Sequence, residues 1–378
     1  MRRNQEGDVA DINSQDSRVD ACEVVVVGAG LIGATIATSL ADEGLDVAVL
    51  EARGVASGAT GRTAGLVCSG LPLPYAQAVE RYGRETTRAL WRLTADNRAR
   101  VAEAAGRLDV PVERTGSLLL ATDAQQGSLL RASAEMLGAD GFEFRFEATD
   151  PLKKGFTAAL HSPDDLVVDA VTLTRRLLSA FEIPIHTNTE VYGLEQAGDD
   201  VLVLAHGRAV RAGTVVLAIN AYAPLLDGYF ADKIAPARSH TLMTRPLSER
   251  LMVRAGSTGS FSFRQDNDGR LLFAACQPAY ETPAATPRDE NSEIDLARFI
   301  GRHFPEATER LAQRGSGTLG VSRDGLPLLG ALPHLPQVFF AVGFGGHGLS
   351  LTFSAADLMM GLILGGAEPE LFSARRME

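Results

Sequence analysis

The chain has 378 residues, of which 45 % are hydrophobic and 22 % charged, a composition typical of a globular protein with a sizeable buried core. Its formal net charge of −11 excludes an electrostatic footprint for nucleic acid or an anionic membrane, because both bind clustered Lys and Arg. Three scattered cysteines, Cys22, Cys68 and Cys276, form neither a disulfide framework nor a zinc spacing and favour a reducing, cytoplasmic setting. We therefore expect small-molecule partners.

The two ends of the chain predict no targeting or membrane segment. Residues 1–20 are polar throughout and lack the apolar core of a signal peptide, so we expect a flexible tail. The longest apolar run, residues 349–364, contains Asp357 and is shorter than the roughly 20 residues that span a bilayer. We expect no membrane span. The seven histidines show no paired ligand spacing, so we expect no metal site either.

The first strong motif is the run "EVVVVGAGLIGATIATSLADEGLDVAVLE". A β-branched run ends in a glycine loop and predicts a buried parallel strand. Gly28 permits the tight turn, Gly30 allows a pyrophosphate to approach, and Gly33 allows the following helix to pack closely. The helix is expected to end near Gly44, and a second strand ends at Glu51, eighteen residues after Gly33. This is the position of an acid that binds ribose hydroxyls, so we predict a dinucleotide site.

The identity of the dinucleotide stays open on these residues alone. FAD and NAD both fit the loop, while an acid at Glu51 argues against a 2′-phosphate. The next stretch, residues 52–70, is rich in glycine and small side chains, which suits backbone lying against a flat ring or a phosphate. An ordinary surface loop is the alternative.

A second glycine loop, "GFGGHG", spaces Gly343, Gly345 and Gly348 in the same G-x-G-x-x-G pattern. A second fingerprint would need a further apolar strand ending in an acid, and residues 365–378 offer none. We therefore predict that the two loops hold opposite ends of one cofactor, with the phosphates at the first loop and the ring at the second. The helix that begins near Gly348 is expected to direct its N-terminal N–H groups at the ring.

The middle of the chain predicts a second architecture. Residues 80–108 read as one or two amphipathic helices that carry Trp91, and "RTGSLLLATD" and "FEFRF" read as short strands. A strand, a helix and a strand follow over 164–195, and a hairpin and a buried strand over 199–220. Residues 236–275 alternate like an antiparallel sheet, a Pro-rich stretch follows, and a helix is expected to run to about Arg314.

Four stretches together resemble the FAD-dependent amine and amino-acid oxidoreductases of the D-amino-acid oxidase, glycine oxidase and sarcosine oxidase type. They are the first glycine loop through "ATGRTAGLV", then "DLVVDAVTLTRRLL", "VVLAINAYA", and "SRDGLPLLG" with "VFFAVGFGGHGLSL". The resemblance implies an α/β fold in which a Rossmann-like FAD-binding domain is interleaved with a substrate domain on an antiparallel or mixed sheet. We expect the FAD domain from 21–75, 155–230 and 315–378, and the substrate domain from 76–154 and 231–314.

The resemblance also implies the site. The ADP half of FAD would be held by Gly28, Gly30, Leu31, Ile32, Gly33, Glu51 and Ala52. The ribityl chain and ring would be lined by Ala59, Thr60, Arg62, Thr63, Ala64, Gly65 and Leu66. Val191 would contact adenine, and the ring would lie by Gly343, Phe344, Gly345, Gly346, His347, Gly348, Leu349 and Ser350.

Departures from the family pattern bear on the substrate. Sarcosine oxidase-like members carry a lysine at the position of Ser350 and a flavin-bonding cysteine near "GVSRDG". Glycine oxidase-like members carry a carboxylate-binding arginine at the position of Leu319, and some dimethylglycine dehydrogenase-like relatives attach flavin through a histidine at the position of Arg62. We therefore expect non-covalent FAD and a substrate other than plain glycine or sarcosine.

Candidate substrate residues complete the prediction. Arg264, Arg323 or Arg62 would replace the missing carboxylate anchor, and each is alternatively a solvated or flavin-facing charge. Phe261 and Phe263 would form an apolar wall of the substrate cavity or belong to the core. His347 is the candidate catalytic residue, with a structural hydrogen bond as the alternative.

The implied activity is oxidation of a small amine or amino acid, an N-substituted glycine or another secondary amine. Hydride would pass from the C–H next to nitrogen to flavin N5, the imine would hydrolyse, and O2 would yield hydrogen peroxide. Three alternatives stay open: a flavin-dependent dehydrogenase that passes electrons to a quinone or a partner protein, an NAD(P)-dependent dehydrogenase, and a non-enzymatic binding module. The substrate, the electron acceptor and the oligomeric state do not follow from the sequence.

Overall fold

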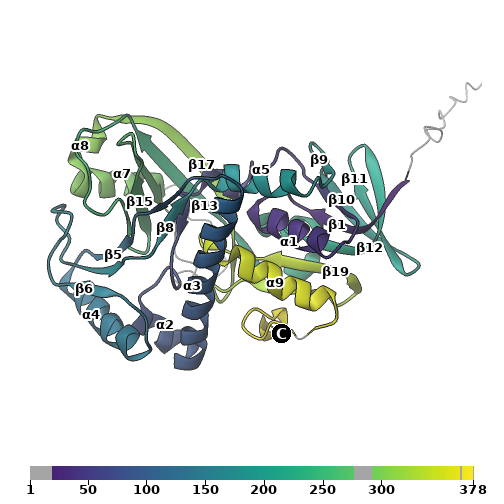
Figure 1. Cartoon of the computed structure of the whole chain (residues 1–378), viewed down its shortest axis with the longest axis horizontal. Helices are drawn as coiled ribbons and strands as arrows, with labels where there is room; N and C mark the ends of the chain where they lie inside the picture. The colour runs from purple at the N-terminus through teal and green to yellow at the C-terminus, as the bar shows by residue number, and fades with distance from the viewer. Residues whose placement is uncertain (1–18, 276–291, 367, 378) are drawn as a thin grey trace, which may run out of the picture.

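The computed structural model describes residues 19–275, 292–366 and 368–377, and its two lobes lie side by side along the longest axis (Figure 1). Most of the expected flexible tail, the Pro-rich stretch and Cys276 lie outside these residues. Within the described residues, Val19 and Asp20 already belong to the first strand.

The first lobe is built on a sheet whose centre is parallel. Its strands read as continuous apolar runs because helices or loops cover both faces, and Val24, Val25, Val26 and Val27 are all buried. The hydrogen-bonded order is β10 (Val191–Ala197), β11 (Asp200–Ala205), β12 (Arg208–Leu217), β1 (Val19–Val27), β2 (Val47–Leu50) and β9 (Ile185–His186). The end of β12 also pairs in parallel with β19 (Leu335–Val342), which pairs antiparallel with β18 (Leu328–Leu332).

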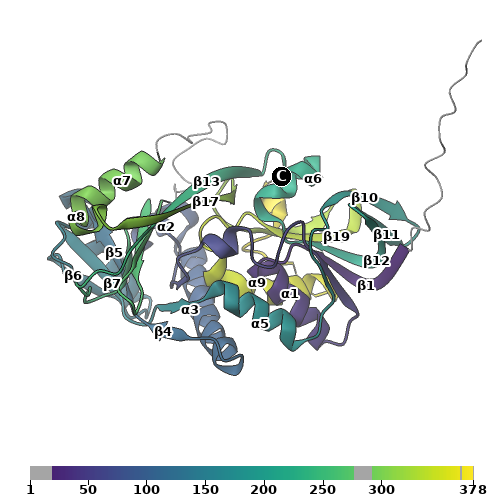
Figure 2. The ribbon, with the colours of Figure 1, turned by 90° about the horizontal axis from the view of Figure 1, so that it is seen from above.

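Three helices lie next to one another on one face of this sheet (Figures 1 and 2): α1 (Leu31–Asp42), α5 (Ala170–Ala180) and α9 (Thr352–Ile363). The hydroxyls of Thr35 and Thr352 hydrogen-bond at 3.0 Å, which ties α1 to α9. The opposite face packs Val25 and Val27 against Phe230 and the β11 strand. Segments from the first, middle and last parts of the chain therefore form one layered unit.

The second lobe is built on a mixed sheet of eight strands. It is antiparallel except where β14 and β5 pair in parallel. The order is β17 (Leu311–Ser322), β13 (Ile234–Thr244), β16 (Leu271–Ala275), β15 (Phe261–Gln265), β14 (Ala255–Ser257), β5 (Ser117–Ala121), β7 (Ala158–Ser162) and β6 (Arg145–Glu147). A small third sheet joins β3 (Leu66–Val67), β8 (Leu166–Val168) and β4 (Val112–Arg114).

Helices surround the second sheet. The longest helix, α3, stands beside α9; in the view of Figure 1, α2 and α4 lie at the bottom of the lobe, and α7 and α8 lie at its top left. Their bounds are α2 (Tyr75–Tyr82), α3 (Arg84–Arg107), α4 (Ala124–Ala139), α7 (Ser292–His303) and α8 (Pro305–Thr308). The single-turn helix α6 spans Ala223–Leu226, and 3₁₀ turns span Ala59–Arg62, Asn220–Tyr222, Gly228–Phe230, Gly348–Leu351 and Ala374–Met377. None of the described helices combines the length and apolarity of a membrane span.

The fold departs from the sequence expectations at three places. The helix expected to reach Arg314 is wrong beyond Thr308, because residues 311–322 form β17 along nearly the whole length of β13. Helix α4 lies between β5 and β6, where only two short strands are expected from the sequence. Strands β7 and β17 both belong to the second sheet, although β7 and most of β17 lie in segments expected with the FAD domain.

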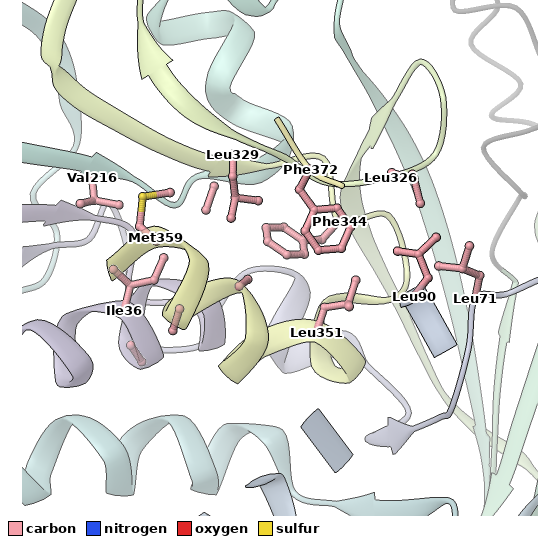
Figure 3. Packing of buried hydrophobic residues seen from close by; sticks show 14 of the residues in the cluster. Ile36, Leu71, Leu90, Val216, Leu326, Leu329, Phe344, Leu351, Met359 and Phe372 are labelled. Carbon is pink, nitrogen blue, oxygen red and sulfur yellow. The ribbon is translucent and has the colours of Figure 1, made fainter. Parts of the chain in front are cut away.

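One hydrophobic cluster crosses between the lobes. Figure 3 shows Val216 and Ile36 of the first lobe in the same packing as Met359 of α9, Leu71 and Leu90. The two lobes therefore share a core, and the space between the glycine loops is enclosed by packed elements on both sides.

Candidate active site

The first glycine loop is shaped by close backbone contacts. Gly28 has φ of +107°, and a Cβ there would lie 2.8 Å from the carbonyl oxygen of Ala218. A Cβ on Gly33 would lie 2.0 Å from the carbonyl oxygen of Gly28. Both positions therefore require glycine, as the fingerprint predicts.

Hydrogen bonds fix the end of β2 beside this loop. The carboxylate of Glu51 accepts the backbone N–H of Ala29 at 2.8 Å and that of Arg53 at 2.9 Å. A carboxylate has about four acceptor positions, so both oxygens keep capacity for a ribose hydroxyl. The Leu31 N–H at the start of α1 donates to the Thr60 hydroxyl at 3.0 Å, which brings the following loop over the helix N-terminus.

The second glycine loop is held by Asn220, a residue that the sequence analysis did not single out. Its side-chain oxygen accepts the N–H groups of Gly343 at 2.8 Å and Phe344 at 3.2 Å. The loop also reaches the second sheet, since Gly345 N–H donates to the Gly320 carbonyl of β17 at 2.8 Å. The loop is thus tied to both sheets.

The helix after this loop starts later than expected. Residues Gly348–Leu351 form a 3₁₀ turn, and α9 begins at Thr352. Buried Asn97 of α3 accepts the Phe353 N–H at 2.8 Å and donates to the Leu349 carbonyl at 3.1 Å. The expected N-terminal N–H groups are therefore partly satisfied by Asn97, and the 3₁₀ turn is the segment beside the loop.

One cavity of about 660 Å³ connects the two glycine loops. It is lined at one end by the first loop and Glu51, at its middle by the second loop, and at its other end by the second sheet. Most residues expected to contact a cofactor line it: Gly28, Gly30, Leu31, Ile32, Glu51, Ala52, Ala59, Thr60, Arg62, Thr63, Ala64, Leu66, Val191, Gly343, Phe344, Gly345, Gly346, His347, Gly348 and Leu349. Gly33, Gly65 and Ser350 instead support the wall, the last by accepting the Cys68 N–H at 2.9 Å.

Residues 23–362 match the family model described as "FAD dependent oxidoreductase". The chain belongs to this family. Glycine oxidase of Pseudomonas aeruginosa is 26 % identical over 364 residues, covering 92 % of this chain and 95 % of that protein. Gamma-glutamylputrescine oxidoreductase of Escherichia coli is 24 % identical over 374 residues, with 92 % and 84 % covered. The crystal structure of glycine oxidase from Geobacillus kaustophilus shares the fold, with a TM-score of 0.78 at 21 % identity over 93 % of this chain and 96 % of that one.

The described residues of this FAD-dependent oxidoreductase fit the cofactor of its family. Gly30 lines the cavity without a Cβ, so a diphosphate can approach the backbone there, and Glu51 offers acceptors to a ribose. The second loop lines the cavity with four glycines, together with the larger side chains of Phe344, His347 and Leu349.

The two candidate phenylalanines face away from the cavity. Phe263 is fully buried among Phe273 and Phe304, and the Phe261 ring stacks on Phe299 of α7 with centroids 4.8 Å apart. Side chains alternate along a strand, so Ser262 is the residue of β15 that lines the cavity. Of the two alternatives, wall or core, the structure places them in the core.

The three candidate arginines are dispersed. Arg323 is exposed and donates to the Met377 carbonyl at 3.1 Å, away from the cavity. Arg62 lines the cavity, but its guanidinium donates to the Ser57 and Gly58 carbonyls of its own loop. Arg264 lies beside Gly65, with a buried Nε that has no hydrogen-bond partner, and burial lowers its pKa.

His347 lines the cavity as an uncharged ring. Its Nε2 hydrogen-bonds the Gly70 carbonyl, so this nitrogen carries the proton and Nδ1 has only a lone pair. Desolvation lowers the pKa of His347 to about 4, although the bond to Gly70 acts in the opposite direction. The ring is therefore neutral at physiological pH.

A polar group that the sequence analysis missed lies where the cavity meets β5 and β7. Asp165 is buried and accepts the Ser117 hydroxyl at 2.6 Å and the Ser69 N–H at 3.0 Å. Burial raises the pKa of Asp165, while these donors and Arg98 lower it. Ser69, Ser117, Ser162 and Asp165 all line the cavity, although they are up to 96 residues apart in the chain.

Proposed function

We propose that this chain is an oxidase of a small secondary amine, with N-substituted glycines among its candidate substrates, and that it holds FAD without a covalent bond. Bound FAD would supply the acceptor for the hydride from the C–H next to the substrate nitrogen; the imine product would be hydrolysed by water, and O2 would be reduced to hydrogen peroxide as the flavin is reoxidised. The observation that carries the proposal is the single cavity that joins both glycine loops to the second sheet.

The residues of the chain contribute placement. The first loop and Glu51 orient the nucleotide half, and Asn220 fixes the second loop beside the ring. The sheet presents small, uncharged side chains to the substrate, among them Ser239, Ser262 and Ala274. A compact amine can approach the ring along this wall.

One feature of the cavity supports a substrate other than glycine itself. Leu319 lines the cavity at the position where glycine oxidase-like members carry an arginine, so a free carboxylate finds no cation there. The curated relatives are named for glycine and for gamma-glutamylputrescine, and both compounds carry an amino group. The uncharged ring of His347 adds no positive charge that would repel an amine.

Non-covalent attachment is supported by the residues around the ring. Arg62 stands where relatives attach flavin through a histidine, and its guanidinium is bonded to its own loop. The thiol of Cys68 has a pKa raised well above its ordinary value by burial, so it is a poor nucleophile. Acid precipitation of the purified protein should release all of the yellow colour into the supernatant; colour retained in the pellet would contradict this part of the proposal.

The activity is tested with purified protein and a panel of amines. We expect a flavin spectrum and, under air, peroxide formation that equals oxygen consumption with secondary amines. Bleaching of the flavin without oxygen consumption, together with reduction of an added quinone-like dye, would instead establish the dehydrogenase alternative. If the protein binds no FAD when it is refolded or incubated with FAD, the proposal is wrong.

A further inference from the structure

The group Ser69, Ser117, Ser162 and Asp165 forms a polar wall at the end of the cavity beyond the second glycine loop. It adjoins the loop because His347 bonds Gly70, the residue next to Ser69. From there the cavity continues between β5, β7 and α2, past Leu73 and Tyr75. A substrate that reacts at the ring can therefore extend into this end.

Hydrogen bonding determines what the wall can recognise. Ser117 donates its only hydroxyl proton to Asp165 at 2.6 Å. Its oxygen therefore offers only lone pairs to the cavity, and it accepts a hydrogen bond from whatever lies there. Asp165 has only 2 % of its side chain exposed, so it acts behind Ser117 as a buried carboxyl group.

The charges around Asp165 do not cancel. Arg98 is the only cation that pairs with it among the described residues, at 3.3 Å, and Arg98 also pairs with Asp164 at 3.5 Å. Two carboxylates thus share one guanidinium, which leaves one formal negative charge, and Arg98 also donates to the Ser69 hydroxyl of the wall. Arg98 itself does not line the cavity.

No described residue at this end offers a positive charge to the cavity. The lining arginines are Arg53 and Arg62, and both belong to the loop after β2. Arg53 stacks on the Tyr222 ring at 5.5 Å, and Arg62 bonds Ser57 and Gly58. The ring of His347 is uncharged, so none of the described residues that line this end carries a positive charge; the buried guanidinium of Arg264 lies beside Gly65, outside the lining.

We propose that the polar wall at Ser117, backed by Asp165, binds a second, protonated amino group of the substrate at a distance from the reacting nitrogen. The substrate class is then a diamine or aminoalkyl amine that carries no carboxylate beside the reacting nitrogen. An ammonium group donates up to three hydrogen bonds and carries a positive charge, which matches an acceptor backed by a carboxylate. This inference rests on the proposed function and narrows it, since N-substituted glycines are then no longer candidate substrates.

The test measures flavin reduction without oxygen, so that the dissociation constant separates from the rate of reduction. The FAD-loaded protein is mixed in stopped flow with N-methylalkylamines, with the N-methyl diamines of equal chain length, and with N-methylglycine. We expect the diamines to bind at least about tenfold more tightly than the monoamines, and N-methylglycine to bind most weakly. In Asp165→Asn and in Ser117→Ala, this preference should fall by at least about tenfold.

Asp164→Asn is the matched control, because it also removes a carboxylate that pairs with Arg98 but changes no cavity-lining residue. It should keep the preference for diamines. If Asp165→Asn does not fold, as judged by melting and by flavin absorbance, the Ser117→Ala variant decides. Tighter binding of N-methylglycine than of diamines, or equal weakening of monoamines and diamines in both variants, would overturn the inference while leaving the proposed function intact. Reduction of the flavin by no amine at all would overturn both.

Discussion

At the scale of single residues, the first glycine loop has no room for side chains. A Cβ on Gly33 would lie 2.0 Å from the Gly28 carbonyl oxygen, a separation that backbone atoms can relieve only by moving apart. We expect Gly33→Ala to weaken FAD binding at least tenfold, about 1.4 kcal/mol, measured by flavin absorbance after dialysis. Gly106→Ala in α3 is the control, since a Cβ there meets nothing within 4 Å, and it should retain FAD. Equal FAD content in both variants would contradict this reading.

The histidine of the second loop predicts a pH dependence of stability. Its pKa is about 4 in the folded protein, below the ordinary 6.5, because the buried ring resists charging. Between about pH 6.5 and 4 the unfolded chain therefore binds a proton that the native protein does not, and the free energy of unfolding falls as pH falls. Chemical unfolding at pH 7 and pH 5 should reveal this loss, and His347→Gln should reduce it.

The control for that experiment is His334→Gln, because the His334 side chain is 60 % exposed. This variant should keep the wild-type slope of stability against pH. If His347→Gln and His334→Gln behave alike, burial of His347 does not determine the slope.

Residues of the site were predictable from the sequence where they act within one local unit. Gly28, Gly33 and Glu51 follow from spacing along a single strand, helix and strand. The roles of three polar residues could not be predicted in this way: Asn220, Asn97 and Asp165. Their hydrogen-bond partners lie 123, 256 and 96 residues away in the chain, and a single polar side chain gives no periodic pattern. Alternation along β15 gave the correct spacing for Phe261 and Phe263 but not which face meets the cavity.

At the scale of elements, the contact of α3 with the start of α9 depends on Asn97. Replacing it with alanine leaves the Phe353 N–H and the Leu349 carbonyl buried without their partner. Each such group costs about 1–3 kcal/mol, so Asn97→Ala should lower the melting temperature and alter the flavin spectrum through the adjacent loop. Exposed Asp96→Ala on the same helix should change neither. Loss of stability with an unchanged spectrum would confine the role of Asn97 to packing.

Elements also differ in how well the sequence predicts them. The β1–α1–β2 unit has a clear hydrophobic pattern and clear signals for where each element ends, and its bounds agree closely with the expectation. The helix expected to continue to Arg314 ends earlier because Pro305 starts a separate short turn and the next residues pair with β13. Pairing with a distant strand outweighs local helix propensity there, and this pairing cannot be predicted from the local sequence.

At the scale of the molecule, the α/β fold with a Rossmann-like sheet interleaved with a mixed sheet was predictable through the family resemblance. The parallel pairing of β14 with β5, more than 130 residues apart, was not, because nothing in either short strand specifies its neighbour. The consequence is a second sheet that takes strands from three parts of the chain. The cofactor cavity is therefore closed by segments that only the folded chain brings together.

This arrangement predicts how the whole molecule melts. The cluster that includes Val26 and Ile36 of the first lobe also includes Leu71, Trp91 and Leu160 of the second, so the lobes should unfold together. Calorimetry should give one transition without FAD, and FAD at about 100 times its dissociation constant should stabilise it by about 2.7 kcal/mol. Gly33→Ala should show a smaller shift at the same FAD concentration, since less of it is bound. Two separate transitions, of which FAD moves only one, would mean that the shared cluster does not couple the lobes and that FAD is held by the first lobe alone.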